Sequence, residues 1–152
     1  MSLPLRALII GALLSIVVSM YSAFAGLKIG GVYWPSVTMA VVAMALLTLL
    51  GNTNKNEINI AQTAASAGGL LAAGLIFTIP AIWLLGLEVT LLEIFFVSIV
   101  GGITGIIFSI PLRKEMVERE QLPYPDGQAT ASIIEAGDEK GDKAKLVFSM
   151  LG

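Results

Sequence analysis

Histidine and cysteine are both missing from this chain of 152 residues. Without cysteine, disulfides, thiolate metal sites and cysteine nucleophiles are excluded. Without histidine, Ser-His-Asp catalysis, histidine-ligated zinc and imidazole proton relays are excluded as well. Any proton that this chain moves must therefore travel on a carboxylate or on water. We expect no catalytic residue, no bound cofactor and no metal site, so the chain is not expected to be an enzyme.

Charged residues are also scarce, at 13% of the chain, whereas apolar residues make up 56%. A soluble domain has about 25% charged and about 45–50% apolar residues. A chain this short cannot bury that much apolar surface in its own core. The lipid bilayer is therefore the expected partner of that surface. The net charge of −2 and the few basic residues leave no footprint for nucleic acid.

Long apolar runs dominate the first part of the chain, at residues 5–26, 32–50, 60–85 and 91–110. Each run is close to the ~20 residues that a helix needs to cross a ~30 Å hydrocarbon layer. The runs are continuous and do not alternate with polar residues, which favours helices over barrel strands. We therefore predict an all-α, polytopic membrane protein with four spanning helices, of which the third is loosened by Pro80.

A more polar part follows the fourth run. Residues 111–145 are predicted to form a cytoplasmic segment with a short helix, and the apolar run from Leu146 to Gly152 predicts the start of a fifth spanning helix. We interpret residues 1–152 as a single transmembrane unit and as the N-terminal part of a larger transporter. An ordinary frayed tail, or a genuine short subunit, is the alternative.

The basic residues indicate how the chain crosses the membrane. With the N-terminus inside, Lys28 alone faces outward, and every other basic residue lies on the cytoplasmic side. Both the N-terminus and the C-terminal end are therefore expected to be cytoplasmic, in a plasma or inner membrane. Ala23-Phe-Ala25 before Gly26 also resembles a signal-peptide cleavage site. Cleavage there would leave the other three helices in the same orientation.

Small and polar residues crowd the start of the third run. Asn59, Gln62, Thr63 and Ser66 fall within one arc of a helix, and such a stripe is costly when it faces lipid. One interpretation is a path for substrate or ions. The other is that these groups join helices, as small residues at this density do. Glu57 lies at the mouth of the stripe, where it could bind a cation, carry a proton, pair with Lys55 or cap the helix.

A turn and a second small-polar stretch follow the fourth run. Pro123 to Gly127 has the composition of a turn, and a helix starting at Asp126 would be N-capped by that carboxylate. The helix that starts at Asp126 is interpreted either as a cytoplasmic helix or as a half-helix that returns toward a central site. Asp126, Gln128 and Thr130 are the weaker candidates for the path. The pairs Gly26/Gly30 and Gly101/Gly105 have the Gly-x-x-x-Gly spacing of close helix packing.

Three stretches of the sequence resemble the oligopeptide transporter family, including its yellow-stripe-like branch. They are Leu112-Arg-Lys leading to Leu122-Pro-Tyr-Pro-Asp-Gly-Gln-Ala-Thr-Ala131, Asn59-Ile-Ala-Gln-Thr-Ala-Ala-Ser-Ala-Gly-Gly69, and Gly26-Leu-Lys-Ile-Gly30 with Tyr33-Trp-Pro-Ser36. Asp126 stands where the family usually has a small serine. Members of the family are several times longer, so this chain would supply only their first helices.

The resemblance implies cation-coupled, usually proton-coupled, uptake of small peptides or metal–chelate complexes by symport. It implies that the partners are such a small-molecule substrate and the remaining helices of the transporter. The alternative is a non-transporting membrane subunit or scaffold that packs against a larger partner. The residue types place no catalytic role on any side chain under either hypothesis.

Overall fold

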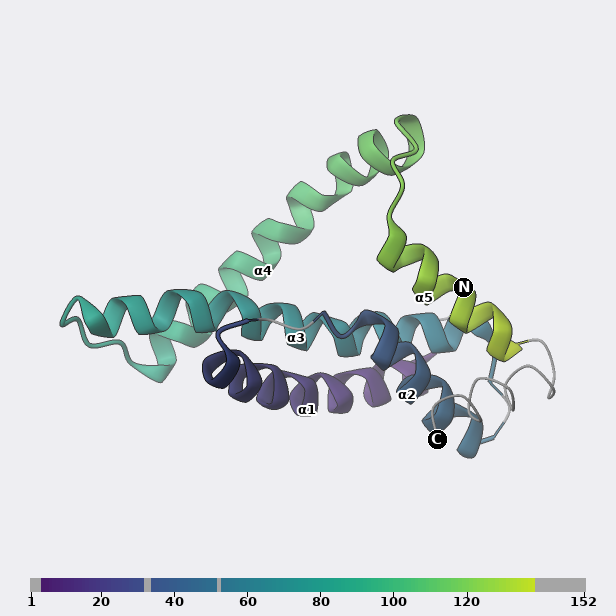
Figure 1. The fold of residues 1–152 in the computed structure, drawn as a ribbon, viewed down its shortest axis with the longest axis horizontal. Helices are drawn as coiled ribbons and strands as arrows, with labels where there is room; N and C mark the ends of the chain where they lie inside the picture. Colours follow the sequence, from purple (N-terminus) through teal and green to yellow (C-terminus); the bar gives the residue numbers. More distant parts are fainter. Residues whose placement is uncertain (1–3, 32–33, 52, 139–152) are drawn as a thin grey trace. The chain divides into compact units, whose positions relative to one another are not determined.

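The computed structural model describes residues 4–31, 34–51 and 53–138, and these form helices joined by short connections (Figure 1). The elements are α1 (Leu5–Ile29), α2 (Ser36–Leu49), α3 (Lys55–Leu84), α4 (Leu91–Arg113), the π-helix η1 (Lys114–Arg119) and α5 (Pro125–Asp138). No strand occurs among these residues, so the predicted all-α class is confirmed. The fifth spanning helix expected from Leu146, and Tyr33 in the second run, lie outside the described residues.

Among the described residues, three helices are long and apolar enough to cross a bilayer, namely α1, α3 and the continuous stretch from Leu91 to Arg119. The second predicted span is shorter than expected, because α2 has 14 residues and reaches only about 21 Å at ~1.5 Å per residue. Pro35 precedes its first residue and Gly51, with a φ of 103°, follows its end. Proline disfavours helix in the residue before it, and a positive φ ends the helix at the other side.

Capping moves the other helix ends away from the ends of the apolar runs. The Asn54 side chain accepts a hydrogen bond from the Glu57 amide at 3.0 Å, so α3 begins at Lys55 rather than at residue 60. Gly30 adopts a φ of 76° and ends α1 after Ile29, beyond the predicted residue 26. Thus α1 ends beyond its apolar run, and α3 begins before its apolar run.

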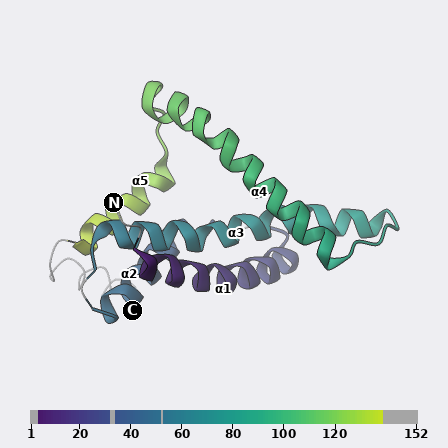
Figure 2. The ribbon, with the colours of Figure 1, turned by 180° about the vertical axis from the view of Figure 1, so that it is seen from behind.

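The chain divides into two compact units, residues 1–76 with 125–152 and residues 77–124. In the first unit, α1 lies along the first part of α3 (Figures 1 and 2). Two contacts between them join residues 51 and 49 positions apart, Arg6 with Glu57 and Ser19 with Gly68. Because the sequence separation between contacting residues is nearly constant, the two helices run parallel and begin at the same end.

Gly68 permits the close approach of α1 and α3. A Cβ atom at this position would collide with the backbone oxygen of Ser15 and would lie 2.7 Å from the Ser19 Oγ. The Ser19 hydroxyl lies 2.9 Å from the Gly68 carbonyl across the helix interface and 2.7 Å from the Ser15 carbonyl of its own helix, and either oxygen can accept its proton. Helices packed in a bilayer use small residues and such hydroxyl bonds in this way, because lipid supplies no hydrophobic drive for their association.

The core of the first unit is built mostly from small and medium side chains. Its buried members come from α1, α2, α3 and α5, and are Ala7, Ala40, Ala43, Met44, Leu47, Ile58, Ala61 and Ile134. Gly137 of α5 leaves room for the Met44 thioether of α2, with which an added Cβ would collide. The core therefore holds α5 against α2, although many residues separate them in the chain.

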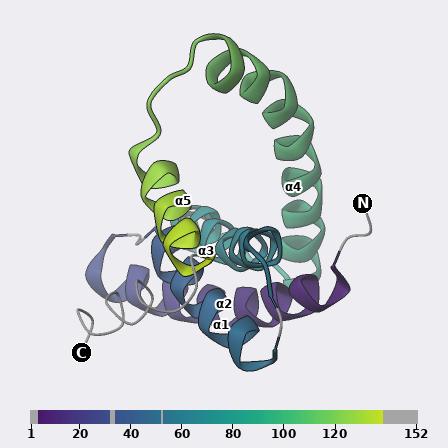
Figure 3. The same ribbon diagram turned by 90° about the vertical axis from the view of Figure 1, so that its right-hand side faces the viewer.

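The second unit consists of the end of α3, the connection to α4, α4 itself and η1; Figure 3 shows α4 continuing into η1. Thr90 and Glu93 close a capping box at the start of α4. None of the residues of α4 is buried by the described part of the chain. Accordingly, a Cβ atom added at Gly101 or Gly105 would contact no described residue within 4 Å. A Cβ atom added at Gly26, of the other predicted pair, would collide with the Ile76 side chain.

Candidate functional site

The polar stripe at the start of α3 is divided between two environments. Gln62 and Ser66 are buried, whereas Asn59 and Thr63 are exposed. The Gln62 Nε2 donates to the Ser66 Oγ at 3.1 Å, and it lies 3.5 Å from the carbonyl oxygen of Ser36 at the start of α2. The bond to Ser66 lies within α3, and the contact with Ser36 reaches from α3 to the start of α2.

Thr63 and Asn59 lie on the open side of the same turn. The Thr63 hydroxyl lies 2.7 Å from the Asn59 carbonyl and 3.2 Å from the Gln62 Oε1, and either oxygen can accept its proton. Because Thr63 bonds within its own helix, its polarity is partly satisfied without a partner elsewhere. The Asn59 side chain is exposed.

Glu57 belongs to a polar cluster that ties the starts of α1 and α3 together. Its Oε2 accepts from the Arg6 guanidinium at 2.7 Å and from the Thr53 hydroxyl at 3.0 Å. The sequence suggested Lys55 as its partner, but Arg6 takes that place because the parallel packing of α1 and α3 brings the two helix starts side by side. Glu57 therefore has a structural ion pair in the described chain.

The three predicted path residues of α5, namely Asp126, Gln128 and Thr130, lie in different environments. The helix begins at Pro125, so Asp126 lies within the first turn and is not the N-cap residue that was predicted. Proline is favoured at the first helical position because the amide it lacks would be unpaired there. Gln128 is exposed, while Thr130 is buried and donates to the Asp126 carbonyl at 2.8 Å.

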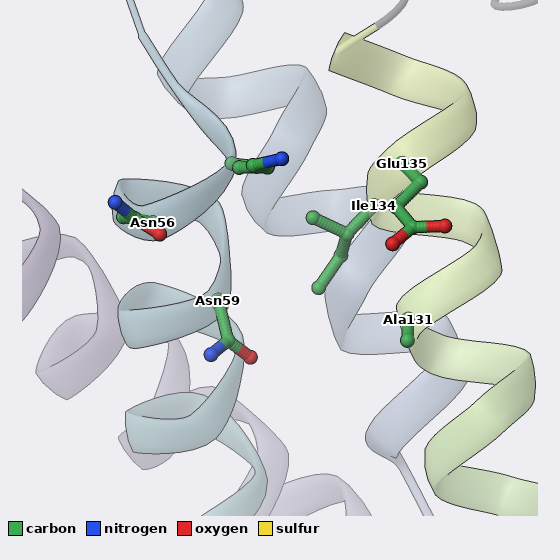
Figure 4. Close-up of a pocket in the computed structure, with 6 residues that line it drawn as sticks. Asn56, Asn59, Ala131, Ile134 and Glu135 are labelled. Carbon is green, nitrogen blue, oxygen red and sulfur yellow. The ribbon is translucent and has the colours of Figure 1, made fainter.

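A hollow of about 180 Å³ lies between the first turns of α3 and the second half of α5. Figure 4 shows Asn59 on one side, with Ala131, Ile134 and Glu135 on the other. The remaining lining residues are Lys55 and Asn56 of α3. The Asn56 side chain points away from α5 in Figure 4, so the hollow combines an ammonium, the Asn59 amide and a carboxylate around a small apolar wall.

Of the predicted path residues, this hollow contains only Asn59. Sequence reasoning missed Lys55, Ala131, Ile134 and Glu135 as members of one site. Their spacing does carry a signal, because Lys55, Asn56 and Asn59, and likewise Ala131, Ile134 and Glu135, share one face of a helix. Nothing in the spacing says that these two faces meet.

Metal binding finds no support in the described part of the chain, where no three acidic, cysteine or histidine side chains come together. The site offers hydrogen bonds and charge, which suit the binding of a small polar molecule.

Comparison with known proteins identifies a family and two relatives. The family described as "OPT oligopeptide transporter protein" matches residues 2–152. A Haemophilus influenzae protein named "Putative oligopeptide transporter" is 36% identical over 117 residues, which are 76% of this chain and 18% of that protein. The Saccharomyces cerevisiae protein named "Putative oligopeptide transporter YGL114W" is 30% identical over 154 residues, covering 87% of this chain and 21% of that protein. No solved structure matches.

This chain spans about a fifth of the length of these two relatives. The family match nevertheless extends over nearly all of the chain, and its long apolar helices mark an integral membrane protein. A family of transporters also agrees with the expectation that the chain is not an enzyme. The resemblance found in the sequence is confirmed, and the chain belongs to the OPT oligopeptide transporter family.

Proposed function

We propose that this chain forms part of a proton-coupled symporter that takes up small peptides or metal–chelate complexes. Family membership supports transport, as do the names of the two relatives. The site residues support the choice of a small polar cargo. The observation that carries the proposal is the hollow between α3 and α5, with charges of both signs around it.

The two charges in the hollow match the two ends of a peptide. Lys55 of α3 can donate to a carboxylate, and Glu135 of α5 can accept from an ammonium group. Asn59 adds an amide that can donate or accept. Charge-assisted hydrogen bonds are about twice as strong as neutral ones, so these end groups would dominate recognition.

The size of the hollow limits what it can hold. Its volume of about 180 Å³ is smaller than the ~300–1,000 Å³ of pockets that enclose a whole drug-sized ligand. A dipeptide, or the charged end of a longer peptide or chelate, is therefore the largest part that this site would receive. The rest of the cargo would contact other parts of the transporter.

The distribution of basic residues supports a position for this site at the cytoplasmic end of the proposed transport path. Arg6 and Lys55 belong to the starts of two parallel helices. With these starts on the cytoplasmic side, as the distribution of basic residues favours, the hollow forms the inner mouth of the path. In alternating access, a substrate would leave the protein through such a mouth.

The test uses the complete protein, purified for binding measurements and reconstituted in liposomes for uptake. Glu135→Gln should weaken the binding of a labelled dipeptide by about tenfold, the equivalent of roughly 1.4 kcal/mol. The same substitution should not change the binding of the N-acetylated dipeptide, which lacks the ammonium group. Lys55→Gln should show the converse pattern with the C-terminally amidated dipeptide. Glu88→Gln, in the exposed connection before α4, is the matched control.

Equal binding of all three peptides by every variant would contradict the assignment of this hollow. Proton coupling predicts that uptake by the wild-type protein stops when a protonophore collapses the pH gradient. If the intact protein moved neither peptides nor metal chelates, the alternative of a non-transporting subunit or scaffold would be favoured.

A further inference from the structure

A second hollow, of about 620 Å³, lies at the end of α4 and the start of η1, within the second unit. It is lined by Ser109, Ile110, Pro111, Arg113, Lys114 and Glu118. None of these residues belongs to the site between α3 and α5. All of them are exposed, and three carry a charge.

The charged residues of α4 indicate the depth of this hollow in the membrane. Between Glu93 and Arg113 the sequence of α4 has no charged residue. At ~1.5 Å per residue this uncharged stretch matches the ~30 Å of a hydrocarbon layer. With Glu93 at one surface, Arg113 and Lys114 lie at the other, at the depth of the lipid headgroups.

The donors in the hollow are limited to two side chains. Ser109 already donates its hydroxyl proton to the Ile106 carbonyl at 2.9 Å, and Pro111 has no amide hydrogen. The Arg113 guanidinium and the Lys114 ammonium remain, with several N–H groups between them. Such a pair of cations at headgroup depth suits a phosphate group.

The charges around the hollow are not paired with each other. Among the described residues, Arg113, Lys114 and Glu118 form no salt bridge, whereas Glu115 and Arg119 pair at 2.8 Å. Both Glu115–Arg119 and Lys114–Glu118 are four residues apart. An acidic residue before a basic one is the better orientation along a helix, and this order favours the first pair over the second. Two cations and one carboxylate are thus left for a ligand.

We propose that this hollow binds the phosphoethanolamine headgroup of a membrane phospholipid. Its phosphate carries a negative charge for Arg113 and Lys114, and its ammonium group a positive charge for Glu118. The acyl chains would lie along the exposed apolar surface of α4, which includes Ile106 and Ile110. A purely anionic lipid would satisfy the two cations but would be repelled by the carboxylate.

The experiment is native mass spectrometry of the complete protein in detergent, with phosphatidylethanolamine, phosphatidylglycerol or phosphatidylcholine added at equal concentration. The wild-type protein should retain phosphatidylethanolamine best. The double variant Arg113→Gln/Lys114→Gln should retain about tenfold less of it, the loss expected for a charge-assisted contact. Glu118→Gln should shift the preference to phosphatidylglycerol.

The matched control is the double variant Glu115→Gln/Arg119→Gln, which removes a formed ion pair from the same segment and spares the lining of the hollow. It should behave like the wild-type protein. Equal retention of the three lipids by the wild-type protein would overturn the proposal. So would a preference for phosphatidylglycerol that Glu118→Gln leaves unchanged, or displacement of the lipid by millimolar inorganic phosphate alone.

Discussion

At the scale of single residues, polar side chains near the start of α3 serve two purposes. Gln62 and Ser66 are each 7% exposed and bond to one another, so their polarity is shielded inside the helix packing. Asn59 lies outside that packing and faces the hollow with α5. A polar group in a membrane helix has to meet protein or water, and this stripe meets both.

The Arg6–Glu57 pair yields a prediction at this scale. The Glu57 side chain is 16% exposed and the Arg6 side chain 36%, so water screens the pair only in part. Replacing either by glutamine should lower the stability of the complete protein in detergent, and the double variant should lose less than the sum of the two. The expected coupling is roughly 1 kcal/mol, near the upper end for partly exposed pairs.

This coupling is measured by thermal unfolding of the wild-type protein, the two single variants and the double variant. Glu115→Gln and Arg119→Gln form a matched cycle on a more exposed ion pair with an N–O distance of 2.8 Å, where the coupling should be smaller. Strict additivity of the Arg6 and Glu57 variants would mean that the contact contributes nothing to the packing of α1 on α3.

At the scale of the helices, close packing depends on where glycine is placed. Gly68 lies against the Ser15 backbone, whereas Gly74 of the same helix has nothing within 4 Å of an added Cβ. The backbone of α1 cannot rotate away as a flexible side chain would. The same residue type therefore has no room for an added Cβ at one position and has room for it six residues later.

Gly68→Ala should separate α1 from α3 and lengthen the contact between the Ser19 hydroxyl and the Gly68 carbonyl. The expected loss is about 1–3 kcal/mol, the usual cost of inserting a methyl group into a packed interface. Thermal unfolding of the complete protein in detergent measures it. Gly74→Ala is the control, and it should be neutral or slightly stabilising because alanine favours helix more than glycine. A neutral Gly68→Ala would contradict the close approach.

At the scale of the whole molecule, the lack of cysteine makes the membrane topology simple to test. The chain has no cysteine, so each cysteine introduced into it is the only thiol that it contributes. We propose that Glu88, between α3 and α4, faces outward and that Lys114, after α4, faces the cytoplasm. This orientation leaves Lys28 as the single basic residue outside, which agrees with the excess of basic residues in cytoplasmic loops.

In intact cells, a membrane-impermeant maleimide should label Glu88→Cys and should leave Lys114→Cys unlabelled. Permeabilised cells should show labelling at both positions, which controls for accessibility of the thiol. The complete protein, with any other cysteines replaced, carries each substitution. Labelling of Lys114→Cys alone in intact cells would reverse the topology and would place the α3–α5 hollow at the outer mouth of the path.

Some details of the fold follow from the sequence, and others needed the packed chain. Pro35 and Gly51 mark the ends of α2, and Pro125 the start of α5, so the shortness of α2 and the displacement of Asp126 were both readable in principle. Long apolar runs nevertheless overstate helix length, because hydropathy does not register a proline or a positive φ. The partner of Glu57 was not readable, since Lys55 is close in sequence but Arg6 is close in space.

The sequence by itself determined that this protein is helical and lies in a membrane, because a chain in lipid has to satisfy its backbone hydrogen bonds within each helix. It also carried the signature of the transporter family in its turns and small-polar stretches. The tertiary structure decided which polar groups are buried, that α1 and α3 run parallel, and that Lys55 and Glu135 border one hollow. Helical periodicity defines the faces of each helix, but only tertiary packing selects which faces of two helices contact each other.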